Sequence, residues 1–441
     1  MFAHAYTILA AVVVVFLLAK TLRLSTELSM LASTVAGGVW HVFAWPGSGL
    51  RIFVPDNSLL RHIVEGMFTY FDVCLIFISA TFFMTLVKES GGVAFIVRRI
   101  VKTFRTRRVV CLLLLTLVML IPGALTGSGA TAVLTVGALV GTVLSAMGVD
   151  DTRRTAAIFM TAAMSAAAPP INLWAMMAAA GANLPYVGFN GPLVVLSVAG
   201  AVFSMFWLAG GGKTADEEEA MKNLPMPPEG INGIRVAAPF VFLAALLLAG
   251  RVWPFDFPVI GLPMIFALSS LVVILCSGVR LKVWEILTRT VRNLLPLVGI
   301  MVVVGALIQI LALSGVRGLI SLKVVILPLS TLFATLFVIL PVSEGILQYA
   351  VAPLLGVPLI MLFNMKGMDA IVALSAMSVL WPLGDCLPPT AVVGRAAVME
   401  LDFRGRYFGD FVKACLVPMA FVALCCTLFL IYSKQLSFLA F

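Results

Sequence analysis

Long apolar segments separated by short polar ones make up most of the chain. A helix needs about 20 apolar residues to cross the hydrocarbon core of a bilayer, and segments of this length recur along the 441 residues. The pattern predicts an all-α polytopic membrane protein. We expect plain membrane-spanning helices at 5–22, 27–45, 67–88, 192–210, 236–250, 258–277, 293–313 and 411–432.

Other apolar segments are interrupted by proline and glycine. We expect two of them, 109–147 and 323–363, to form re-entrant hairpins. Two more, 155–181 and 370–397, each carry a Pro-Pro pair, which removes backbone donors and breaks a helix. Freed carbonyls are tolerated at membrane depth only where they face protein, water or an ion. The interruptions therefore indicate a binding site inside the bilayer.

The two halves of the chain repeat each other. A shift of 219 residues brings together Pro122 and Pro341, Gly137 and Gly356, Gly148 and Gly367, Asp150 and Asp369, Ala157 and Ala376, Pro169 and Pro388, Pro170 and Pro389, and Ala178 and Ala397. We expect a first repeat at 1–210, a polar cytoplasmic linker at 211–234 and a second repeat at 235–441. Broken helices in matching places of two repeats are typical of secondary transporters.

Composition and charge support a membrane protein and give its orientation. The chain is 62% hydrophobic and 11% charged, with a mean hydropathy of +1.13, whereas soluble chains are about 25% charged. The net charge of +9 is distributed over short loops, which excludes nucleic-acid binding. The strongest basic stretch, 98–108, predicts a cytoplasmic loop. If 109–147 enters and leaves on that side, most other Lys and Arg residues also lie inside, and the second repeat is inverted.

The predicted hairpin tips carry small and hydroxyl residues. The first tip, 125–131, faces the break at 167–172, and the second tip, 341–348, faces the break at 384–390. Hydroxyls and freed carbonyls can hold sodium, and half-helix N-termini can receive an anion. The alternative is a helix-packing motif of small residues. Candidate substrate-binding residues are Ser128, Gly129, Thr131, Asn172, Ser343, Glu344, Gln348, Asp385, Thr390 and Arg395.

The ionisable residues that matter most in the interrupted segments of the second half are Glu344, Asp385 and Arg395. Arg395 follows Pro389 by about a turn and a half, and its planar guanidinium suits a substrate carboxylate. Alternatively, it pairs with Asp385 or Glu400, or extends to the cytoplasmic face. Glu344 and Asp385 are candidates to bind a cation or carry a proton.

At these positions the chain resembles a known transporter family. Its motifs are T-G-S-G-A-T-A (126–132), A-A-P-P-I-N (167–172), G-M-D-A (367–370) and G-D-C-L-P-P-T-A (384–391). They look like S-G-S-x-x-A, I-P-P-S, G-I-D-P and G-x-x-T-P-P-V-G of the DctM-like large permease subunit of TRAP transporters, in the ion transporter superfamily. Leu387 replaces the family's threonine.

The resemblance implies sodium-coupled transport of small organic anions, such as C4-dicarboxylates, across the bacterial inner membrane by an elevator motion. It implies no cofactor beyond Na⁺, and as partners a small membrane subunit and a periplasmic substrate-binding protein. The sodium sites implied are Thr126, Ser128, Ala168 and Pro169 at the first tip, and Gly345, Gly384, Asp385 and Pro388 at the second. Stand-alone proton-coupled transport through Asp385 or Glu344 stays open. A membrane-embedded enzyme is a less favoured reading, because we find no HExxH or Gly-x-Ser-x-Gly motif in the spans. A non-transporting assembly subunit is also less favoured, because it would not need the polar residues Asn172, Glu344, Asp385 and Arg395 near the breaks.

Overall fold

A computed structural model describes residues 2–45, 52, 58–214, 217–253, 255–258 and 260–440, and it confirms the all-α polytopic membrane fold. Among these residues nine helices are long and apolar enough to cross a membrane. The predicted plain spans fall on α1 (Phe2–Thr21), α2 (Thr26–Ala44), α4 (Phe71–Glu89), α11 (Asn190–Ala209), α13 (Gly233–Val252), α14 (Leu262–Cys276), α15 (Val283–Leu313) and α21 (Lys413–Ile431). Parts of the predicted repeats and linker, namely 1, 46–51, 53–57, 215–216, 254, 259 and 441, lie outside the described residues.

Several helices lie where we expected loops. Residues 98–104 of the basic stretch belong to the helix α5 (Gly92–Phe104), so the expected loop is limited to 105–107 and the prediction of a loop over 98–108 is wrong. Val93, Val97 and Ile100 are buried along one face, and this spacing matches the helical period of 3.6 residues. Further helices are α3 (Leu59–Met67), α12 (Glu217–Asn223) within the linker, and α16 (Val316–Ile326).

Both re-entrant hairpins are present. The first consists of α6 (Arg108–Thr126), α7 (Gly129–Ala132), the π-helix η3 (Val133–Gly137) and α8 (Ala138–Ala146). The second consists of α17 (Leu329–Leu347), the 3₁₀ turn η4 (Gln348–Ala350), the π-helix η5 (Ala352–Gly356) and α18 (Val357–Met365). The second hairpin begins after Pro328, later than the expected 323, because the proline separates it from α16.

Both Pro-Pro segments break their helices. In the first repeat α9 (Asp151–Ala167) ends before Pro169, and α10 (Leu173–Gly181) begins after it. In the second, α19 (Ala370–Leu380) continues as the 3₁₀ turn η6 (Trp381–Cys386), and α20 (Val392–Glu400) follows the break. The π-helix η7 (Tyr407–Val412) then leads into α21, and the 3₁₀ turn η8 (Ser437–Leu439) follows it.

Matching residues of the two repeats adopt matching local structures. The π-helices η3 and η5 end at Gly137 and Gly356. Gly148 and Gly367 have φ values of 72° and 71°, a left-handed conformation that favours glycine. Each is followed by an aspartate N-cap: Asp150 accepts a hydrogen bond from the amide of Arg153, and Asp369 from that of Val372. The sequence repeat is therefore a structural repeat.

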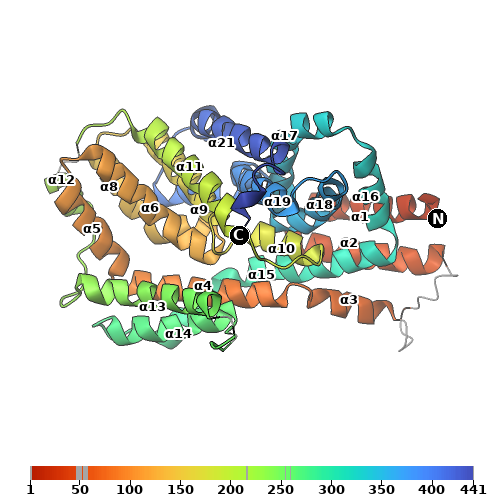
Figure 1. The fold of residues 1–441 in the computed structure, drawn as a ribbon, viewed down its shortest axis with the longest axis horizontal. Helices are drawn as coiled ribbons and strands as arrows, with labels where there is room; N and C mark the ends of the chain where they lie inside the picture. Colours follow the sequence, from red (N-terminus) through yellow and green to blue (C-terminus); the bar gives the residue numbers. More distant parts are fainter. Residues whose placement is uncertain are drawn as a thin grey trace.

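The hairpins approach the centre of the molecule from opposite sides (Figure 1), with α6 and α8 to the left of the view and α18 to the right. Helices α3, α4, α13, α14 and α15 run along one side, below the hairpins in this view. The broken helices form the core between the hairpins. Every residue of α9 from Thr155 to Ala167 is buried, so the helix faces protein all round.

Candidate functional site

The first hairpin tip folds on its own hydroxyl groups. Gly127, with a φ of 69°, ends α6, and Ser128 caps α7 by accepting a hydrogen bond from the amide of Thr131 at 3.3 Å. The Thr126 hydroxyl donates to the Pro122 carbonyl at 2.8 Å and accepts from the amide of Ser128 at 3.3 Å. Thr126 and Ser128, two of the proposed sodium ligands, thus lie together in a tight turn.

The first break is attached directly to the first hairpin. The amide of Ile171 donates to the carbonyl of Ala124 at 3.1 Å. On α9, the hydroxyl of Ser165 accepts from the amide of Gly123 at 2.8 Å and donates to the carbonyl of Leu120 at 2.7 Å. Ala168, between them, is extended and 5% exposed. These bonds attach the segment that contains Ala168 and Pro169 to the end of α6, just before the first tip.

Asn172 links the two half-helices of the first break to the second repeat. Its side-chain carbonyl caps α10 by accepting from the amide of Ala175 at 3.0 Å. Its amide donates to the Ala167 carbonyl at 2.9 Å and to the Ser378 hydroxyl at 3.0 Å. Both amide hydrogens are thus used. Asn172 is fully buried, and its observed contacts are those of a structural bridge.

The second tip is packed tightly against its break. Thr390 donates from both its amide and its hydroxyl to the Gly345 carbonyl, at 3.2 and 2.8 Å. A Cβ on Gly345 would lie 2.8 Å from that of Leu387, and one on Gly384 would overlap the backbone of Pro341. Glycine at these two positions therefore permits close backbone approach.

Glu344 lies in the interior, where the two repeats meet. Its side chain is fully buried, and Oε2 accepts a hydrogen bond from the indole N–H of Trp174 at 2.8 Å. Its other oxygen, Oε1, has no hydrogen-bond partner among the described residues. Asp385, on the adjoining turn η6, is 4% exposed. A buried carboxyl requires a proton, a cation or further donors, so this pair is a candidate ion or proton site.

The ring of Tyr349 joins the second tip to the first. Its hydroxyl donates to the carbonyl of Gly127 at 3.3 Å. The ring packs on that of Trp174, with the ring centroids 4.7 Å apart. The two tips, which approach from opposite sides, therefore meet in the middle of the molecule.

A cavity of about 910 Å³ extends from the hairpin tips to the ends of the plain helices. Five of the predicted substrate-binding residues line it: Ser128, Thr131, Gln348, Thr390 and Arg395. Asn172, Glu344 and Asp385 lie deeper in the protein, and Gly129 and Ser343 are also outside the lining. Of the predicted substrate-binding residues, those that line the cavity therefore come from the two hairpin tips and from the segment of the second break.

Arg395 is the positively charged side chain among the predicted substrate-binding residues, and it lines this cavity. It lies on α20, is exposed, and donates one hydrogen bond to the carbonyl of Pro389 at 3.1 Å. Within the described part of the chain it pairs with neither Asp385 nor Glu400, so neither of the internal ion pairs that we considered is formed. Its guanidinium can thus receive an anion from the cavity.

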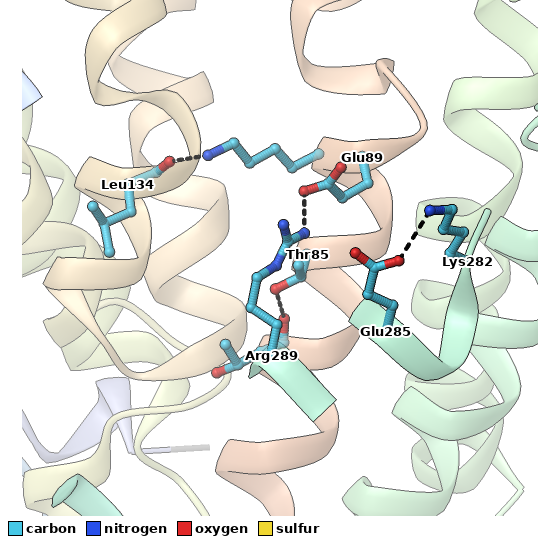
Figure 2. A network of polar contacts seen from close by, with 8 residues as sticks. Thr85, Glu89, Leu134, Lys282, Glu285 and Arg289 are labelled. Carbon is cyan, nitrogen blue, oxygen red and sulfur yellow. Dashed lines mark hydrogen bonds and ion pairs between the residues drawn. The ribbon is translucent and has the colours of Figure 1, made fainter. Parts of the chain in front are cut away.

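The plain spans also contribute polar residues to the cavity, which the sequence analysis missed. They include Lys20, Glu27, Lys88, Glu89, Arg289 and Asn293. Arg289 of α15 pairs with Glu89 of α4 at 2.5 Å (Figure 2). These residues lie near helix ends, which is a usual place for charged residues in any membrane protein. The sequence therefore did not indicate that they share a cavity.

No known protein family matches the sequence, and no curated protein matches it. The fold matches several solved structures, and two of them are described as transporters. The first is MtrF of Neisseria gonorrhoeae, described among antimetabolite efflux pumps, with 16% identity, a TM-score of 0.62, and coverage of 91% of this chain and 94% of that one. The second is the YdaH transporter of Alcanivorax borkumensis, with 15% identity, a TM-score of 0.60, and coverage of 90% and 97%.

These similarities correct the resemblance drawn from sequence motifs. The structural neighbours are AbgT-family transporters, so the assignment to TRAP large permeases is wrong. The motifs consist of glycines, small residues and Pro-Pro pairs, which form tips and breaks in any fold of this kind. They therefore identify the architecture but not the family. The chain therefore shares the fold of these two transporters, and its long apolar helices are those of a multi-pass membrane protein.

Proposed function

We propose that the protein is a secondary active transporter of small organic anions, with the substrate in the cavity between the hairpin tips. The observation that supports this most directly is that the exposed residue Arg395 lines the same cavity as Ser128 and Thr131 of the first repeat and Thr390 of the second. Arginine binds carboxylates through two parallel hydrogen bonds, and the hydroxyl of Thr131, which lines the same cavity, offers a further donor. The substrate class proposed is therefore a mono- or dicarboxylate.

The coupling ion that we propose is sodium, at the first tip. Thr126, Ser128, Ala168 and Pro169 gather hydroxyl and carbonyl oxygens, the ligands that hard cations prefer. The second tip has fewer such groups, because Gly345 and Leu347 occupy the positions of Thr126 and Ser128 in the repeat. Binding of sodium at the first tip would draw the tip and the break together beside the substrate.

Proton coupling is a second candidate, favoured by one observation. Glu344 is fully buried and its Oε1 has no partner among the described residues. A carboxyl in this position can exchange a proton as the second hairpin moves. The replacement Glu344→Gln would then abolish transport driven by a proton gradient, while leaving transport driven by a sodium gradient intact.

Transport by the purified chain in liposomes tests the proposal. Uptake and efflux of a carboxylate panel are measured under imposed sodium or proton gradients. We expect Arg395→Gln to raise the KM for the anion by roughly 10- to 100-fold, the usual effect of losing a charged hydrogen bond. The control is Arg406→Gln, because the Arg406 side chain is 84% exposed and pairs with Asp410 away from the cavity.

The outcomes discriminate between the candidates. An unchanged KM in Arg395→Gln would overturn the proposed anion site, and movement only outward would indicate an efflux pump. Transport by the chain alone would show that neither a small membrane subunit nor a periplasmic binding protein is needed. Right-side-out vesicles from a bacterial inner membrane provide the same test in the proposed location.

A further inference from the structure

Lys88, at the end of α4, is bonded to the first hairpin. Its Nζ donates a hydrogen bond to the carbonyl oxygen of Leu134 in the π-helix η3 at 2.5 Å. Figure 2 shows Leu134 with the dashed line that marks the bond to its carbonyl oxygen. The neighbouring residue Glu89 points instead to Arg289 of α15. Two consecutive residues thus connect α4 to a plain span and to a hairpin.

The contact crosses the wall of the substrate cavity. Lys88 and Leu134 both line the cavity, and so do Ser128 and Thr131 on the same hairpin. Leu134 follows Thr131 by three residues, about one helical turn. The bond therefore connects α4 to the part of the hairpin that carries the tip hydroxyls.

The π-helix makes its carbonyls suitable acceptors. The regular i to i−4 bonding of an α-helix is interrupted in a π-helix, and such segments are frequent at functional sites. A carbonyl oxygen also has two lone pairs, so it can accept a bond from Lys88 in addition to one from the backbone. A lysine, with its long stem, can reach such an oxygen from the adjacent helix.

The second repeat has a π-helix but lacks the lysine. The position of Leu134 is taken by Pro353 in η5. Lys88 lies three residues before Gly91, the left-handed glycine before α5, and Ala312 lies three residues before the corresponding Gly315. Alanine cannot make the contact. The bond therefore distinguishes the first hairpin from the second, although their backbones correspond.

We propose that Lys88 is a positioning residue that holds the first hairpin against α4 while the cavity is open near the basic helix α5. The inference rests on the proposed function, in which the hairpins move past the plain spans. Movement of the hairpin separates Nζ from the Leu134 carbonyl. Glu400 of α20 interacts electrostatically with Lys88 and is available to the released ammonium group.

The test measures the access of a reagent to the cavity and needs no substrate. Thr131→Cys is introduced with Cys276 and Cys425 replaced by alanine, since these two native thiols are half-buried and would contribute background. A membrane-impermeant maleimide is applied to inside-out and right-side-out vesicles. We expect Lys88→Met to slow labelling from the face near α5 by roughly three- to tenfold, and to speed it from the opposite face. Lys88→Arg should restore the parental rates.

The control is Lys282→Met. Lys282 appears in the same view (Figure 2), is 81% exposed, and pairs with Glu285 at 3.3 Å rather than with the hairpin. Labelling that changes equally in both variants, or in neither, would overturn the proposal. Total labelling after denaturation, together with gel filtration, separates misfolding from a shift in access. Because the readout is independent of cargo, a failed anion assay would not be confused with failure of the positioning role.

Discussion

Replacing Gly384 by alanine tests the close contact between the second break and α17. A Cβ at this position would overlap the carbonyl oxygen of Pro341 and would lie 2.6 Å from its carbonyl carbon and 2.9 Å from its Cα. Carbon atoms pack best at about 3.5–4.0 Å, so the two segments must separate by at least ~1 Å. Both partners are backbone, so no side-chain rotation can relieve the overlap.

The cost follows from the overlap and from the bonds beside it. Overpacking usually costs about 1–3 kcal/mol. The separation also weakens the two hydrogen bonds from Thr390 to the Gly345 carbonyl, at 3.2 and 2.8 Å, each contributing about 1 kcal/mol. We therefore expect Gly384→Ala to lower the free energy of unfolding by about 2–4 kcal/mol.

Thermal unfolding of the detergent-purified protein measures the effect. The matched control is Gly318→Ala in α16, because a Cβ there meets nothing within 4 Å. Alanine should stabilise that exposed helix by up to about 1 kcal/mol. A melting temperature of Gly384→Ala equal to that of the parent protein would refute the reasoning, since it would mean that the break and α17 are not in backbone contact.

Two further predictions concern the caps of the broken helices. Asn172→Ala should lower the free energy of unfolding by about 2–3 kcal/mol. The reason is that the caps of both half-helices and the bond to Ser378 are lost together. A melting temperature within error of the parent would contradict the bridging role. Asp369→Ala should cost about 1 kcal/mol, and Asp369→Asn much less, since asparagine also caps. An equal loss in both Asp369 variants, measured in the same melt, would show that the cap at α19 is not what stabilises the helix.

Most of the architecture could be predicted from local sequence because the bilayer imposes strict local requirements. The length of the apolar segments predicted the membrane-spanning helices, and the Pro-Pro pairs predicted the helix breaks at Pro169 and Pro388. The predictions failed for a segment between spans, because most of the predicted loop 98–108 belongs to the helix α5. Amphipathic helices at a membrane surface have the polar composition of loops, and their burial depends on what packs against them.

The site was predicted less completely than the fold. Residue type and proximity to a break selected Arg395 and Asn172 equally, although one faces the cavity and the other bridges half-helices. Nothing in the sequence distinguished Lys88 from other basic residues at helix ends. The family assignment failed for a related reason, because the motifs reflect requirements of the backbone that unrelated sequences share.

The sequence alone determined that the chain spans a membrane, that its halves repeat, and where its helices break, since each of these follows from the cost of exposing polar backbone to lipid. The tertiary structure decided which polar groups meet: the two tips at Tyr349 and Gly127, the buried Glu344 and Trp174, and the cavity between Arg395 and Lys88. These contacts join residues far apart in the chain. Their geometry depends on how helices pack, which periodicity and composition do not specify.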